Sequence, residues 1–176
     1  MEIINMLALC PRQKQMCAQI LTDALPQGWP TLAQAMETVK ELDIPQNSIL
    51  AITEGDDVIA WGGIMPDYDG HVFEIHPLVV RADKRGSGVG AMLITALENV
   101  ARVRSGLTIM LGCDDETFAT SLSGCDLYDG LPDKMERFDS GSHATGFYRR
   151  MGYTVIGVIP DANGKGKPDI LMAKRL

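Results

Sequence analysis

Apolar residues recur every three or four positions in several stretches of the chain, which is the spacing of an amphipathic helix. In the longest stretch, Leu93, Leu97 and Ala101 fall on one helical face. Proline and glycine interrupt the pattern at Pro26 and Gly28, and Thr31 is placed to cap the helix that follows. The pattern predicts helices over residues 12–25, 31–42, 88–104 and 143–151.

Short aliphatic and β-branched runs, bounded by Gly, Pro and Asp, lie between these helices. They predict strands over residues 49–54, 58–64, 71–80, 107–112, 153–159 and 169–174, with a loop at 66–70. Glu54-Gly55-Asp56-Asp57 is typical of a hairpin turn. The order predicts an α/β fold whose mixed, mainly antiparallel sheet is flanked by helices. The length of 176 residues suits a single domain over 1–176.

Residues 113–143 form an insertion between a predicted strand and a predicted helix. Long connections in compact domains are often functional. This one carries eight acidic residues against Lys134 and Arg137, with His143 at its end. The insertion is therefore either a surface for cationic ligands or a solvated acidic loop.

Charge, apolar runs and cysteine spacing each exclude a class of function. The net charge is −7 and no Lys/Arg stripe appears, so nucleic acid is not an expected partner. No apolar run approaches the length of a membrane span, and the apolar start lacks a basic region, so we expect neither a membrane segment nor a signal peptide. The four cysteines show no zinc spacing, which favours reduced thiols, a cytoplasmic protein and no metal.

A glycine-rich loop leads straight into the long predicted helix. Its sequence is Arg85-Gly86-Ser87-Gly88-Val89-Gly90-Ala91. Glycines let the backbone N–H groups turn toward one point, and a helix N-terminus adds positive charge there, so the loop is suited to a phosphate or pyrophosphate. Arg81, Lys84 and Arg85 add further positive charge.

Three known kinds of phosphate-binding loop match this sequence to different degrees. A P-loop requires Gly-Lys-Ser/Thr, which is absent here. The Rossmann pattern fits formally at Gly86, Gly88 and Ala91, but residues 81–85 separate the strand from the glycines, and repeated βαβ order is lacking. The spacing of Arg85, Gly88 and Gly90 matches the acyl-CoA loop of the GNAT N-acetyltransferases. A simple helix start with turn glycines is the remaining alternative.

Beyond the loop, three blocks of sequence resemble the aminoglycoside 6'-N-acetyltransferases of the GNAT superfamily. The first is Glu74-Ile75-His76-Pro77-Leu78-Val79-Val80. The second is Leu111-Gly112-Cys113-Asp114-Asp115-Glu116 with Thr120-Ser121-Leu122-Ser123 and Asp126-Leu127-Tyr128. The third runs from Phe147 to Tyr153 and continues through 158–164 and 167–170. Together they cover most of residues 58–174.

This resemblance implies a GNAT fold and transfer of acetyl from acetyl-CoA to a primary amine of an aminoglycoside, by a homodimer. Two positions depart from the family pattern: Gly146 stands where relatives carry Glu, and Ala144 where they carry Pro. Another amine acceptor, such as a polyamine or a basic protein, is therefore one alternative. A non-catalytic module that binds acyl-CoA or the antibiotic is a second.

A primary amine is protonated at neutral pH, so acetyl transfer requires a proton acceptor. Glu74 and His76 lie two residues apart on a predicted strand and so share a face. We expect Glu74 to be the base and to contact the amine, with His76 as helper or relay. The competing interpretations are an exposed strand carboxylate and a histidine that packs before Pro77.

The resemblance also implies roles for backbone groups and for a tyrosine. Leu78 and Val80 would supply N–H donors to the oxyanion and pantetheine, where Pro77 interrupts strand pairing. Tyr148 occupies the family's position for the donor to the leaving thiolate, although a packed helix tyrosine is a serious alternative. The expected acetyl-CoA contacts are Leu78, Val79, Val80, Arg85, Gly86, Ser87, Gly88, Val89, Gly90, Ala91 and Tyr148.

Three further residues are candidates for binding the acceptor. Asp114 and Asp115 end a predicted strand, and carboxylates at such a position can pair with ammonium groups. Trp29, between Gly28 and Pro30, would either wall the acceptor cleft or anchor the core.

Overall fold

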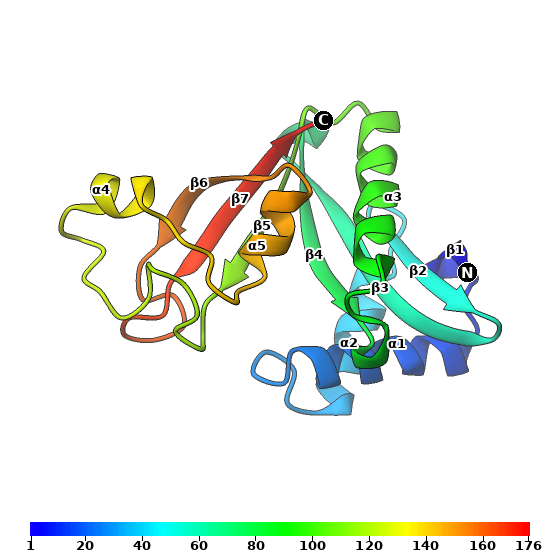
Figure 1. Cartoon of the computed structure of the whole chain (residues 1–176). Helices are drawn as coiled ribbons and strands as arrows, with labels where there is room; N and C mark the ends of the chain where they lie inside the picture. The colour runs from blue at the N-terminus through cyan, green and yellow to red at the C-terminus, as the bar shows by residue number, and fades with distance from the viewer. The chain divides into compact units, whose positions relative to one another are not determined.

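Two units make up the chain in the computed structural model, which describes residues 1–176 (Figure 1). The first unit contains Met1–Ile109 and the last residue, Leu176. The second contains Met110–Arg175. The single domain expected over the whole chain therefore stays a prediction.

The helices of the first unit form where the apolar spacing and the capping residues predict them. Thr31 accepts a hydrogen bond from the N–H of Gln34 at 3.3 Å, which fixes the start of the second helix. Gly88 adopts a left-handed conformation as the N-cap of the longest helix. The observed bounds are α1 Pro11–Ala24, α2 Leu32–Leu42 and α3 Val89–Val103, so the predicted helices are confirmed.

Four antiparallel strands form the sheet of the first unit, in the order β1-β2-β3-β4. The three strands expected here are confirmed, although β3 extends through Pro66 and Asp67, where a loop was expected. The sequence did not predict β1, which pairs with β2 and is followed by a short 3-10 turn over Met6–Ala8. The bounds are β1 Glu2–Asn5, β2 Ser48–Glu54, β3 Asp57–Asp67 and β4 Val72–Val80.

Helices cover both faces of this sheet. Buried residues of α1 and α2 pack with Ile49, Ala51 and Trp61 in one apolar cluster, and the Trp61 indole donates to the carbonyl of Cys17 at 2.8 Å. No residue of α3 belongs to that cluster, although α3 contacts β2, β3 and β4. Helix α3 therefore covers the opposite face.

The second unit has three strands in the order β5-β7-β6, and β6 runs antiparallel to β7. Helix α5 packs against β7. The expected strands and the short helix are confirmed, and the acidic insertion contains one further helix, α4. The bounds are β5 Thr108–Asp114, α4 Leu131–Glu136, α5 Thr145–Arg150, β6 Thr154–Ile159 and β7 Asp169–Arg175. No helix in either unit has the length and apolar character of a membrane span.

Candidate functional site

The glycine loop between β4 and α3 presents a row of unused hydrogen-bond donors. A 3-10 turn over Ala82–Lys84 ends β4, and the loop then turns through Gly86 and Gly88, whose φ angles are +74° and +88°. The first intrahelical bond of α3 is donated by Met92 to the carbonyl of Gly88. None of the six N–H groups from Gly86 to Ala91 donates a hydrogen bond within the chain. A Cβ atom at Gly86 or Gly88 would meet nothing within 4 Å, so the space beside them is open.

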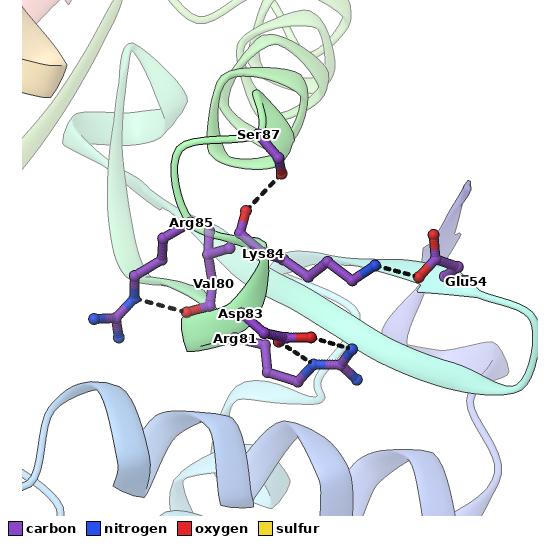
Figure 2. Close-up of polar contacts among 7 residues, drawn as sticks. All are labelled: Glu54, Val80, Arg81, Asp83, Lys84, Arg85 and Ser87. Atoms are coloured by element: carbon purple, nitrogen blue, oxygen red, sulfur yellow. Dashed lines mark hydrogen bonds and ion pairs between the residues drawn. The ribbon is translucent and has the colours of Figure 1, made fainter.

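Of the three basic side chains at this loop, only Arg85 has no carboxylate partner (Figure 2). Arg81 binds Asp83 through two hydrogen bonds of 2.7 and 3.0 Å, and Lys84 pairs with Glu54. The Nε of Arg85 donates to the carbonyl of Val80 at 3.2 Å, which leaves its terminal nitrogens for an anion. A pocket of about 220 Å³ adjoins the same turn and is lined in part by Ile20, Ala24, Val80 and Arg85.

Strand β4 alternates between buried and half-buried residues along its whole length. Glu74 and His76 are both half-buried, whereas Ile75 between them is buried, so the two polar side chains share the partly open side, as predicted. Neither side chain makes a hydrogen bond or an ion pair within the chain. Both are therefore available to a ligand.

The pairing of β3 with β4 is irregular beside His76. The register shifts between Gly62, which faces Leu78, and Ile64, which faces Ile75, so β4 carries one extra residue there. A Cβ atom at Gly62 would lie 2.8 Å from the carbonyl oxygen of Pro77. The absence of a side chain at Gly62 therefore allows the two backbones to approach each other, and the interruption expected at Pro77 is confirmed.

Trp29 lies at the edge of the apolar cluster rather than inside it. It is half-buried, whereas Trp61 is fully buried. The ring centroids of Trp29 and His76 are 5.8 Å apart at an interplanar angle of 50°. The indole N–H donates to the hydroxyl of Thr38 on α2 at 2.8 Å. Trp29 thus packs against the core and contacts the ring of His76, and its place in an acceptor cleft stays a prediction.

In the second unit, the structure corrects the expectation for Asp115. Its side chain is buried, and its two carboxylate oxygens accept hydrogen bonds from the N–H groups of Ala119 and Thr120 and from the hydroxyl of Ser123, each at 2.8 Å. Burial alone would raise the pKa of Asp115, but these bonds lower it from 3.8 to about 2. Asp115 therefore organises the start of the acidic insertion and does not face a cationic ligand.

We expect Asp115→Asn to reduce the free energy of unfolding by about 2 kcal/mol at neutral pH, because an amide cannot accept all three bonds. The folded pKa lies below the unfolded one, so this stabilisation is present above about pH 4 and is lost as the pH falls through about 2. Urea unfolding at several pH values measures both effects. Glu136→Gln, an exposed acid-to-amide change on α4, is the matched control. Equal stability of the two variants at pH 7 would contradict the prediction.

Asp114, in contrast, is exposed at the end of β5. One of its carboxylate oxygens accepts from the side-chain amide of Asn163, and Nε2 of His143 donates to its carbonyl at 3.0 Å. The other carboxylate oxygen makes no hydrogen bond within the chain. Asp114 therefore remains a candidate for binding an ammonium group.

Tyr148 is buried on α5 among aromatic rings of its own unit. Its ring centroid lies 5.2 Å from that of Phe147 and 5.7 Å from that of Tyr153. Burial, with a smaller contribution from the thiol of Cys113, raises the pKa of Tyr148. The phenol therefore keeps its proton at neutral pH, and its role as a donor stays a prediction.

All four cysteines are free thiols. Burial raises the pKa of Cys17 and of Cys113 to about 12, so neither is a nucleophile at neutral pH. No group of three His, Cys, Asp or Glu side chains in the chain is arranged to hold a metal ion.

Comparison with known proteins decides the family. The Acetyltransferase (GNAT) family matches residues 14–128, which contain most of α1, the β3–β4 pair and the glycine loop. This chain belongs to the GNAT family of acetyltransferases. The GNAT α/β fold inferred from the sequence resemblance is thereby confirmed. Membership of the family favours the acyl-CoA loop over the P-loop and the Rossmann loop, and the contact of the glycine loop with acetyl-CoA stays a prediction.

Among solved structures, two aminoglycoside 6'-N-acetyltransferases are each 34% identical to this GNAT protein, with 99% of this chain and 97% of the other covered. One was crystallised with coenzyme A and has a TM-score of 0.94. The other, from Enterococcus faecium, has a TM-score of 0.91. An aminoglycoside 6'-acetyltransferase type Ii is 29% identical, over 99% of this chain and 97% of the other, with a TM-score of 0.77. No match was found among curated proteins.

The first unit of this GNAT protein thus brings together most of the predicted site residues. Glu74, His76 and Trp29 lie together, and the glycine loop follows the end of the same strand. Asp114, Asp115 and Tyr148 belong to the second unit. Sequence reasoning missed Thr38, since its contact with Trp29 joins positions on two different segments and leaves no local signal.

Proposed function

We propose that this GNAT protein transfers the acetyl group of acetyl-CoA to the 6'-amino group of an aminoglycoside antibiotic. The observation that carries the acceptor assignment is the similarity, at 34% identity over 99% of the chain, to an aminoglycoside 6'-N-acetyltransferase complexed with coenzyme A. The net charge of −7 is consistent with a polycationic acceptor. Exposed Asp114 is a candidate partner for one of its ammonium groups.

The glycine loop fits the pyrophosphate of acetyl-CoA. Six consecutive N–H groups without partners point to an anion, and the helix dipole of α3 and the guanidinium of Arg85 add positive charge. We infer that Leu78, Val79 and Val80 line the pantetheine arm, as the family resemblance implies. Acetyl-CoA supplies the activated thioester for the reaction.

Glu74 and His76 are the residues we assign to the proton of the amine. At neutral pH an alkylamine is almost entirely protonated, and its deprotonation at pH 7 costs about 4–5 kcal/mol. Neither side chain has a partner within the chain, so the Glu74 carboxylate can accept that proton directly or through water, with His76 as relay. The neutral amine then attacks the thioester carbonyl.

Two further groups complete the proposed reaction. The oxyanion of the tetrahedral intermediate accepts a hydrogen bond from the N–H of Leu78, which follows the irregular pairing of β3 and β4. Tyr148 donates its proton or a hydrogen bond to the departing thiolate. Its phenol is protonated at neutral pH, as a donor must be.

A different amine acceptor is the second candidate, and the departure at Gly146 favours it. Gly146 lies on α5, at a position where the resemblance implies a Glu, so that acidic side chain is missing here. If that carboxylate contributes to antibiotic binding, a smaller polyamine or a basic protein becomes a better acceptor.

Thiol release from acetyl-CoA distinguishes these candidates. We expect the highest kcat/KM with a kanamycin-type antibiotic and no release with an analogue that carries a hydroxyl in place of the 6'-amine. Preference for spermidine or a histone peptide would transfer the assignment to those amines. Binding of acetyl-CoA and antibiotic without thiol release would indicate a non-catalytic module.

We propose in addition that the protein acts as a cytoplasmic homodimer, as the family resemblance implies. Sedimentation of the purified protein measures its mass in solution, and a monomer at all concentrations would reject the dimer.

A further inference from the structure

Trp29 is held in place by two hydrogen bonds that it donates, one to the residue that caps the end of α1 and one to α2. Its backbone N–H donates to the carbonyl of Leu25, just after α1, at 3.0 Å. Its indole N–H donates to the hydroxyl of Thr38 on α2 at 2.8 Å. With the backbone and the far end of the side chain both fixed, the plane of the indole ring is determined by the position of Thr38.

The indole ring of Trp29 lies next to the imidazole of His76, which is on the half-buried side of β4. A centroid distance of 5.8 Å lies within the range of favourable aromatic pairs. The imidazole of His76 makes no hydrogen bond within the chain. The ring contact with Trp29 therefore restrains the orientation of the imidazole.

We propose that Thr38 is a positioning residue for acetyl transfer, which acts by fixing Trp29 against His76. This inference rests on the proposed function, since it assigns His76 and Glu74 to the proton of the amine. The hydroxyl of Thr38 fixes the indole of Trp29, and the indole fixes the imidazole of His76. The imidazole thereby stays on the same side of β4 as the Glu74 carboxylate.

The two tryptophans of the chain show why this contact differs from ordinary core packing. Trp61 is fully buried, and its indole donates to a backbone carbonyl of α1. A main-chain acceptor serves to satisfy a buried donor. Trp29 is half-buried at the edge of the cluster, and its acceptor is a side chain that a single substitution removes.

Thr38→Val tests the first step, because it removes the acceptor and nearly keeps the shape. Nuclear magnetic resonance of the full-length protein reports the exchange of each indole N–H with water. We expect faster exchange for Trp29 and no change for Trp61, which serves as internal reference. We also expect the ring protons of His76, assigned from the His76→Gln spectrum, to lose their ring-current shift. Unchanged exchange and unchanged His76 signals would overturn the proposal.

Acetyl-transfer kinetics test the second step. For Thr38→Val we expect kcat with a 6'-amine acceptor to fall about tenfold, since small misplacement of a catalytic group is costly, and the acetyl-CoA KM to stay within about twofold. Thr38→Ser keeps the hydroxyl and should restore kcat. Thr22→Val on α1 removes a hydroxyl that makes no hydrogen bond and should behave like the parent.

Equal loss in Thr38→Ser and Thr38→Val, or unchanged kcat in both, would overturn the positioning role. Failure of the proposed function gives a different result. If the parent acetylates no aminoglycoside, the exchange and ring-current measurements still decide whether Thr38 positions Trp29 and His76.

Discussion

Glu74→Gln should lower kcat for acetylation of a 6'-amine by about 10²-fold or more, or about 2.7 kcal/mol of transition-state stabilisation. Glutamine keeps the size and hydrogen-bonding atoms of the side chain but cannot accept the proton that the attacking amine must lose. Glu74 is half-buried on β4 and makes no internal ion pair, so the substitution breaks no structural contact. Steady-state kinetics and calorimetric binding of acetyl-CoA measure the two expected effects.

Acetyl-CoA affinity should stay the same in Glu74→Gln, because the glycine loop lies beyond the far end of the strand. Glu37→Gln, an exposed carboxylate-to-amide change on α2, is the control and should retain the parent rate. A parent-like rate for Glu74→Gln at neutral and alkaline pH would show that this carboxylate is not the base. His76 or water would then have to accept the proton.

Gly88→Val should weaken acetyl-CoA binding at least about tenfold, or about 1.4 kcal/mol, in a calorimetric titration. Gly88 has a φ of +88°, a conformation that β-branched residues rarely adopt. A valine would also occupy the open space in front of the unpaired N–H groups, where we place the pyrophosphate.

Gly70→Val separates these two causes. Gly70 has a φ of +82°, and its Cβ would also meet nothing within 4 Å, but it lies in the turn between β3 and β4. Both valine variants should lose stability to a similar extent, and only Gly88→Val should lose acetyl-CoA affinity. Equal acetyl-CoA affinity in the two variants would show that the glycine loop does not bind the pyrophosphate.

Local signals explain which parts of the fold were predictable. The long helix α3 combines a periodic apolar face with glycines at its start, so both its position and its anion-binding loop can be read from consecutive residues. The two polar residues of β4 follow from strand alternation alone. The insertion was recognised by its charge and its place between two regular elements.

Features that depend on distant partners were not predictable. Strand β1 has only four residues and forms by pairing with β2, which begins more than forty positions later. Asp115 resembles its exposed neighbour Asp114 in sequence, and only the fold of the following residues encloses it. The same holds for Thr38, whose hydroxyl is significant because Trp29 lies against it.

The close approach of β3 to β4 at Gly62 bears on how this enzyme can evolve. Any side chain at Gly62 would collide with the carbonyl oxygen of Pro77 and press on the backbone of Leu78, and backbone atoms cannot move aside as a flexible side chain can. The position carries no charge and no reactive group, yet it is closed to substitution. Exposed acidic residues of the insertion, such as Asp126 and Asp129, do not carry this constraint. Substitutions at these exposed residues of the insertion are therefore expected to be tolerated, while the glycine on β3 beside β4 stays unchanged.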